Sequence, residues 1–236
     1  SVAIWKELFA ERGIEAKDVF IGSEEAGYEL GMQGGRIFYY DAGKNWWSRS
    51  GKPETMPIGE IGGPDSEVFY DFGAEHATHP IYKDKQPHPN SDSGQFLEIG
   101  NSVFIEYVKN SDGTFSKLPQ SNVDFGGGLE RISAAKVGEP DMFKVDLLWK
   151  VIEQIQQLSG KKYEDNLVAF RVITDHIRGA VFLIGDGVLP GNTDQDYFVR
   201  RLLRRAVRFA DQLDVPAGKF AELAESVIET YKNHYP

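Results

Sequence analysis

The chain has 236 residues, of which 41% are hydrophobic, and a net charge of −10, so it can form one large domain or a domain with a helical appendage. The absence of cysteine excludes a disulfide framework, a thiolate metal site and a thiol nucleophile, and it is typical of a reducing, cytoplasmic setting. No run of about 18 apolar residues occurs, which argues against a membrane-spanning helix.

The first residues predict a helix, because apolar side chains recur with helical spacing at Val2, Trp5, Leu8 and Phe9. No secretory signal pattern precedes them. The chain begins with serine rather than methionine, from which we expect a piece of a longer protein.

Residues 1–125 are β-rich after this helix. Five segments combine β-branched or aromatic residues with flanking Gly, Pro, Asn or Asp, which is typical of strands. They are residues 18–22, 36–40, 67–71, 95–108 and 122–125. Ser111-Asp112-Gly113 predicts a hairpin turn between the last two.

Residues 128–236 are helical in pattern. The predicted helices are residues 129–136, 141–159, 165–184, 194–211 and 219–233. Gly160 and Gly185 stand where helices are expected to stop. Strands followed by helices, without β-α-β alternation, predict an α+β fold with an antiparallel sheet and then a helical bundle.

Residues 121–131 read Ser-Asn-Val-Asp-Phe-Gly-Gly-Gly-Leu-Glu-Arg, a strand that passes through three glycines into a helix. Glycine allows close approach of a ligand to the backbone, and a helix N-terminus attracts anions. Arg131 suits a phosphate, while Asp124 suits an ammonium or a ribose hydroxyl. One ligand with both ends would explain the segment; a plain structural turn, capped by Asp124, is the alternative.

A second feature is a cluster of five arginines within nine residues, which spans about 140° of a helix surface. Its members are Arg200, Arg201, Arg204, Arg205 and Arg208. The apolar side predicted to dock consists of Leu202, Leu203, Ala206, Val207 and Ala210. A solvated, salt-bridged face is one interpretation, and binding of a polyanion such as RNA is the other.

Residues 74–94 are polar and predict a surface excursion. His76, His79 and His88, with Glu75, have no familiar metal-ligand spacing. We therefore expect solvated histidines there and no metal site.

Several ordered segments together resemble the alanyl-tRNA synthetase family, and they span nearly the whole chain. They are Asn-Trp-Trp-Ser at 45–48, Gly-Pro-Asp-Ser-Glu-Val-Phe-Tyr-Asp at 63–71, Glu-Ile-Gly-Asn-Ser-Val-Phe at 98–104, and residues 123–131. Residues 171–178, 185–192, Tyr197 and 199–206 continue the resemblance. It implies a partial class II synthetase sheet, with residues 1–160 in the aminoacylation domain and 161–236 in the helical tRNA-recognition domain.

The chain also departs from the family pattern. Motif 3 is present, but motifs 1 and 2 are not found, nor are the editing and C-terminal domains. Where the family has Gly-Pro-Cys-Gly-Pro-Cys, residues 60–65 read Glu-Ile-Gly-Gly-Pro-Asp. The family's Gly-Met-Gly is Gly126-Gly127-Gly128, and its Arg-Gly-Tyr is Gln195-Asp196-Tyr197.

The resemblance implies an ATP-dependent alanine–tRNA ligase, in which Asp124 binds the α-ammonium of alanine and Asn101 binds the alanine or adenylate backbone. Trp47, Val103 and Gly126 would shape the side-chain pocket. Such a pocket excludes large residues but discriminates weakly against glycine, since one methyl group is worth only about 1–3 kcal/mol.

On the nucleotide side, the resemblance implies that Gly126, Gly128 and Arg131 bind ATP, with Arg131 on the γ-phosphate. Mg²⁺ would bridge phosphate oxygens and take few protein ligands, with Glu98 as one candidate.

For RNA, the resemblance implies that Asn192 reads the tRNA(Ala) acceptor stem while Arg200, Arg201, Arg204 and Arg205 follow its phosphates. The missing N-terminal part of the catalytic domain is an expected partner. Without it, we expect weak or no activity, and a non-catalytic module that binds the acceptor stem is the alternative function.

Overall fold

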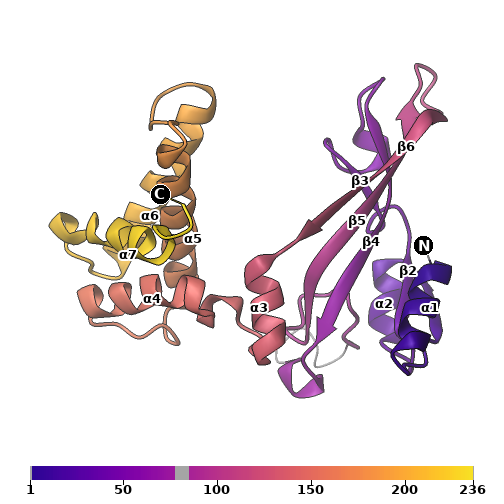
Figure 1. Ribbon diagram of the computed structural model, residues 1–236, viewed down its shortest axis with the longest axis horizontal. Helices are drawn as coiled ribbons and strands as arrows, with labels where there is room; N and C mark the ends of the chain where they lie inside the picture. Colours follow the sequence, from indigo (N-terminus) through magenta and orange to yellow (C-terminus); the bar gives the residue numbers. More distant parts are fainter. Residues whose placement is uncertain (1, 78–84, 236) are drawn as a thin grey trace. The chain divides into compact units, whose positions relative to one another are not determined.

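The computed structural model describes residues 2–77 and 85–235, and the chain divides into two compact units, Ser1–Met142 and Phe143–Pro236 (Figure 1). An antiparallel sheet lies in the first unit and a group of helices forms the second, which confirms the predicted α+β class. No helix in these described ranges is long and apolar enough to cross a bilayer.

The main sheet has four antiparallel strands in the order β3-β4-β5-β6. These strands are β3 (Trp46–Ser48), β4 (Ile61–Asp71), β5 (Phe96–Lys109) and β6 (Phe115–Gly127). The predicted hairpin turn joins β5 to β6: Gly113 has a φ of 83°, and Asp112 Oδ1 accepts a hydrogen bond from the Thr114 amide at 2.9 Å. The side chains of β5 and β6 can therefore be assigned to faces by their register.

A β-α-β unit precedes this sheet, contrary to the expectation that none occurs. The parallel strands β1 (Asp18–Gly22) and β2 (Ile37–Tyr40) are connected through α2 (Glu24–Leu30), and α1 (Val2–Glu11) is the predicted opening helix. Ser23 starts α2, since its hydroxyl oxygen accepts from the Ala26 amide at 3.2 Å. A seven-residue helix is too short to show a clear apolar period.

The second unit contains α4 (Asp146–Ser159), α5 (Leu167–Gly185), α6 (Asp194–Gln212) and α7 (Glu222–Tyr231). Gly160 ends α4 in the left-handed conformation, as predicted, whereas Gly185 is still helical and α5 is capped by Asp186. The fully buried core of this unit comprises residues from all four helices and the connections between them. Its largest members are Tyr163, Phe170, Ile152, Ile155, Ile173, Leu213 and Leu223.

Elsewhere in the described residues the chain forms α3 (Leu129–Val137) and four 3₁₀ turns. The turns are η1 (Pro53–Thr55), η2 (Ala74–His76), η4 (Met142–Lys144) and η5 (Ala217–Lys219). In space the chain divides at Met142, because Val151, Ile152 and Ile155 of α4 pack in the helical core. The functional division at residue 160 stays a prediction.

The prediction of solvated histidines is wrong for His88, which is fully buried. The hydroxyl of Tyr40 lies 2.8 Å from His88 Nδ1, and the Tyr28 ring packs edge-on at 4.8 Å. A Cβ on Gly27 would lie 2.9 Å from the same ring. Burial lowers the pKa of His88 to about 4, so the imidazole is neutral at pH 7. His79 lies outside the described residues.

Candidate functional site

The glycine segment forms the predicted junction between strand and helix. β6 ends at Gly127, Gly128 is the N-cap of α3, and Arg131 lies in the first turn of that helix. A Cβ on Gly128 would be 3.1 Å from Arg131 Cδ, so glycine leaves room for the arginine stem. A Cβ on Gly126 would meet nothing within 4 Å, so the space above Gly126 is open to a ligand.

Four predicted alanine-site residues lie on one face of the sheet. Asn101 of β5 is opposite Gly126 of β6, and Val103 is opposite Asp124. Opposed and alternate residues of an antiparallel pair share a face, so the four are neighbours. Val103 is buried, whereas Asp124 is exposed and its carboxylate has no hydrogen-bond donor or ion pair in the described part of the chain. Asp124 therefore does not cap the glycine turn.

Arg131 is fixed to the same end of β5. Its guanidinium donates to the Glu98 carboxylate at 2.8 Å and to the Glu98 main-chain oxygen at 3.1 Å. Glu98, a candidate Mg²⁺ ligand by sequence, thus neutralises and orients the arginine. Both side chains are partly exposed, at 41% and 32%, so the ion pair contributes about 1 kcal/mol or less to stability.

Two carboxylates of β4 complete this face, and the sequence prediction missed them. Asn101 Nδ2 donates to Asp65 at 3.1 Å and to Glu67 at 3.4 Å. Asp65 lies opposite Val103, and Glu67 lies opposite Asn101. The signal was the alternation of acidic residues in the segment 63–71, but only the strand pairing shows that they meet Asn101.

Three carboxylates, Asp65, Glu67 and Glu98, interact electrostatically on this face of the sheet. Burial raises the pKa of Glu67 to about 7; repulsion from Glu98 and Asp65 adds to the shift, and Lys44 and Arg131 oppose it. Burial likewise raises the pKa of Asp65, although the hydrogen bond from Asn101 partly offsets this effect. An added cation near these groups would be stabilised.

Trp47 lies on β3 opposite Gly63 and is 41% exposed. β4 separates it from Val103, the other predicted wall of the alanine pocket. Its neighbour Trp46 packs on Tyr107 and Phe115, with ring centroids 6.0 and 5.5 Å apart. Of these two tryptophans, Trp47 is therefore the one that a ligand can reach.

A cavity in this unit has a volume of about 490 Å³ and is bordered by Asp65 and Glu67. Neither Asp124 nor Arg131 lines it. The expectation that Asp124 and Arg131 line a common cavity stays a prediction.

The arginine cluster lies on α6, as predicted. Arg201, Arg204, Arg205 and Arg208 are exposed, and Arg200 is half-buried. None of the five forms an ion pair with a carboxylate within residues 2–77 and 85–235. The salt-bridged interpretation of this face is therefore not supported.

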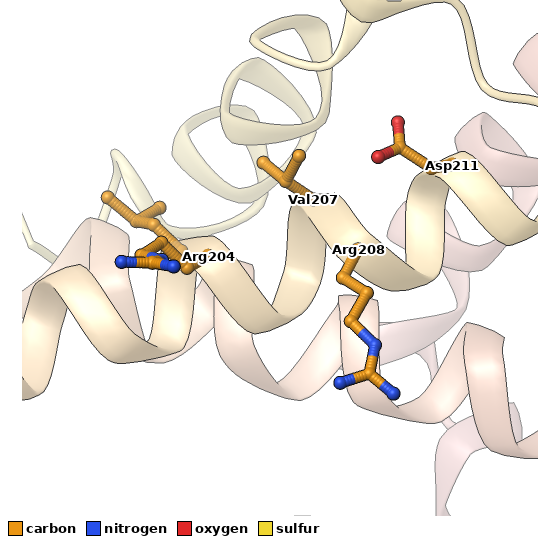
Figure 2. A pocket seen from close by; sticks show the side chains of 5 residues that line it. Arg204, Val207, Arg208 and Asp211 are labelled. Atoms are coloured by element: carbon orange, nitrogen blue, oxygen red, sulfur yellow. The ribbon is translucent and has the colours of Figure 1, made fainter.

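Figure 2 shows Arg204, Val207, Arg208 and Asp211 around a shallow depression on α6. Val207 was expected on the docked side but is 41% exposed; Val199, Ala206 and Ala210 are the buried residues of this helix. The depression is open and its volume is about 380 Å³, so it is a surface feature rather than a deep site.

Asn192 lies just before α6, and its side-chain oxygen accepts a hydrogen bond from Arg200. The guanidinium groups of Arg201 and Arg205 lie over the rings of Phe198 and Phe209, at 5.7 and 5.9 Å. These contacts orient four of the predicted tRNA-binding side chains, Asn192, Arg200, Arg201 and Arg205.

Comparison with known proteins matches residues 18–236 to the family model described as "tRNA synthetases class II (A)". Similar curated proteins include the alanine–tRNA ligases of Shouchella clausii (39% identity over 83% of the chain), Geobacillus thermodenitrificans (38% over 88%) and Listeria innocua (42% over 74%). The matched region covers 23%, 23% and 20% of these relatives, respectively, so the chain spans less than a quarter of their length.

Proposed function

Because the chain belongs to the alanine–tRNA ligase family of class II tRNA synthetases, we propose that it forms the distal part of an aminoacylation site. This site binds ATP and alanine, forms alanyl-adenylate and transfers alanine to the 3′ end of tRNA(Ala). The observation that carries the proposal is the cross-strand register of Asn101 with Gly126 and of Val103 with Asp124, next to Arg131.

In this proposal Asp124 accepts hydrogen bonds from the alanine ammonium, which gives a charge-assisted pair. Asn101 orients the alanine backbone, and Val103, Gly126 and Trp47 limit the size of the side chain. The exposed Asp124 carboxylate and the open space above Gly126 support this placement.

The nucleotide lies toward Gly128 and Arg131. A carboxylate oxygen of alanine attacks the α-phosphorus of ATP, and the bond to the pyrophosphate oxygen breaks. Arg131 offsets the negative charge on the departing group, so catalysis consists of positioning and electrostatics. Mg²⁺ enters with the ATP phosphates as part of the substrate.

The open edge of β6 supports the proposed partner, the remainder of the catalytic domain. β6 pairs only with β5 in the described sheet, and Val123 and Phe125 are 61% and 65% exposed. Leu129 and Ile132 of α3 continue this apolar surface. A long, exposed, apolar edge is a template for another strand. We therefore propose that this part of the domain works with a segment carrying motifs 1 and 2, and that the chain alone is weakly active or inactive.

On the RNA side we propose that the exposed arginines of α6 bind phosphates of the acceptor stem and that Asn192 contacts its base edges. We also propose that the protein acts in the cytoplasm, where tRNA is charged.

The test is calorimetry of the chain with alanyl-sulfamoyl-adenosine, a stable analogue of the adenylate. Asp124→Asn removes the charge with little change of shape, and the affinity should fall at least about tenfold. Glu106→Gln is the matched control, because Glu106 also lies on the sheet and pairs with Lys117 at 3.8 Å. Equal binding by wild type and Asp124→Asn, or no binding by the wild-type chain, contradicts the proposal.

A second candidate function is an RNA-binding module without catalysis, which the absence of ion pairs at the α6 arginines favours. Alanine-dependent exchange of pyrophosphate into ATP separates the two functions. Robust exchange by the chain alone contradicts the non-catalytic module.

A further inference from the structure

The cavity of about 490 Å³ lies between α1, β2 and the free edge of β4. β3 pairs only with residues 62–64 of β4, so the segment from Asp65 to Asp71 has a described strand, β5, on one side only. The indole N–H of Trp5 donates to Ser66 Oγ at 3.0 Å and connects α1 to this edge. The cavity is distinct from the residues proposed to bind ATP and tRNA.

Aromatic side chains make up much of the wall. Trp5 and Phe9 come from α1, Tyr40 from β2, and Phe69 and Phe96 from the paired strands β4 and β5. The volume falls in the range of small-molecule sites, about 300–1,000 Å³. Such a wall suits an apolar or aromatic body, and aromatic faces also attract a cation.

The polar part of the wall is mainly acidic: four carboxylate residues line it, against one arginine, Arg36. Two of the carboxylates have local partners. Asp71 Oδ1 accepts from the Gly73 amide and from Gln95, and Asp41 Oδ1 accepts from the Gly43 amide. The other two, Asp65 and Glu67, are half-buried, whereas Asp41 and Asp71 are exposed, so Asp65 and Glu67 are the carboxylates that a ligand within the cavity would meet.

The Nδ2 group of Asn101 donates to both Asp65 and Glu67, and the side chain of Asn45 also hydrogen-bonds Asp65. Asp65 Oδ1 and Asn101 Oδ1 are buried and have no hydrogen-bond partner in the described part of the chain. A buried acceptor without a donor is costly, so a ligand in the cavity that brings N–H groups would satisfy Asp65 Oδ1.

These observations favour one ligand class. An anion would be repelled by the carboxylates, and a purely apolar molecule would leave the acceptors unsatisfied. We propose that this cavity binds a small organic ammonium compound, with its N–H groups toward Asp65 and Glu67 and its apolar body against Trp5 and Phe9. This site requires neither Asp124 nor Arg131.

Phenethylamine is the probe, compared with its neutral analogue phenethyl alcohol and with the anion 3-phenylpropionate. Binding is followed at pH 8 by the ¹H–¹⁵N shift of the Trp5 indole. Phenethylamine should bind at least about tenfold more tightly than the alcohol, since a charge-assisted pair is stronger than a neutral one, and the anion should not bind.

Four variants, Glu67→Gln, Asp65→Asn, Glu106→Gln and Asp124→Asn, test where the compound binds. Glu67→Gln should weaken phenethylamine binding at least about tenfold, as expected for the loss of a charged partner. Glu106→Gln and Asp124→Asn should leave it unchanged, and a retained Trp5 shift confirms the fold of each variant. Asp124→Asn also separates this site from the proposed adenylate site, because only adenylate-analogue binding should depend on it. No phenethylamine binding, equal binding of the alcohol, or full affinity in both Glu67→Gln and Asp65→Asn overturns the proposal.

Discussion

The guanidinium of Arg131, in the first turn of α3, lies 2.8 Å from the carboxylate of Glu98 on β5. This contact crosses from the helix to the neighbouring strand and fixes the cationic end of the candidate site relative to the sheet. It explains why Gly128 matters: a Cβ at this position would lie 3.1 Å from Arg131 Cδ and crowd the arginine stem.

Arg131→Gln should reduce the affinity for ATP at least about tenfold and leave the affinity for AMP nearly unchanged, because the charge acts on the γ-phosphate. Calorimetry with both nucleotides measures this difference. Lys136→Gln, at the other end of α3, is the control. Equal losses for ATP and AMP would argue against a γ-phosphate role.

Two glycines of the sheet should respond differently to alanine. A Cβ on Gly63 would lie 1.7 Å from the carbonyl oxygen of Phe104, so Gly63→Ala should cost roughly 3 kcal/mol or more, or prevent folding. A Cβ on Gly126 would meet nothing within 4 Å. Gly126→Ala should therefore keep the free energy of unfolding within about 1 kcal/mol while it weakens binding of the adenylate analogue. Urea unfolding and calorimetry separate the two effects; a folded Gly126→Ala variant with unchanged affinity would remove Gly126 from the pocket.

His88 should make the stability of the first unit depend on pH. Its folded pKa, about 4, lies below the ordinary value of 6.5, so the unfolded state takes up a proton first as the pH falls. The contribution to stability is fully present above pH 6.5 and is lost between 6.5 and 4, with a total on the order of 3 kcal/mol. His88→Gln, compared with wild type by urea unfolding at pH 7.5 and 5, should show a smaller decrease. An identical pH dependence in the two proteins contradicts this account.

Reversal of two exposed arginines of α6, Arg201→Glu with Arg204→Glu, should weaken binding to an acceptor-stem RNA at low salt and reduce the salt dependence of the affinity. Lys219→Glu with Lys232→Glu is the control, because both lysines are exposed on the neighbouring segment of the same unit. Fluorescence anisotropy at several salt concentrations gives the slope. Similar losses in both double variants would indicate nonspecific electrostatics.

The long elements of this fold could be predicted because their patterns are local. Only neighbouring residues determine the β-branched and aromatic content of β5, the turn at Ser111-Asp112-Gly113 and the helical period of α5 and α6. β3 was missed because three residues carry too little pattern, and α2 was missed because a serine cap and seven residues do not make an apolar stripe.

The candidate site was predictable only in part for a related reason. Asp124, Gly126 and Arg131 stand together in one segment, so their proximity follows from the sequence. Asp65 and Glu67 reach Asn101 only through the pairing of β4 with β5, which no short pattern encodes. His88 is similar, because its burial depends on Tyr28, Tyr40 and Gly27, which lie far away in the chain.

The most direct test of the central claim is a crystal structure of the chain with ATP and alaninol, an alanine analogue that lacks the reacting carboxylate. The account predicts the alaninol amine at about 3 Å from the Asp124 carboxylate and the γ-phosphate on the guanidinium of Arg131. A structure in which the two groups contact different molecules, or in which the ligands bind without touching either residue, would contradict it.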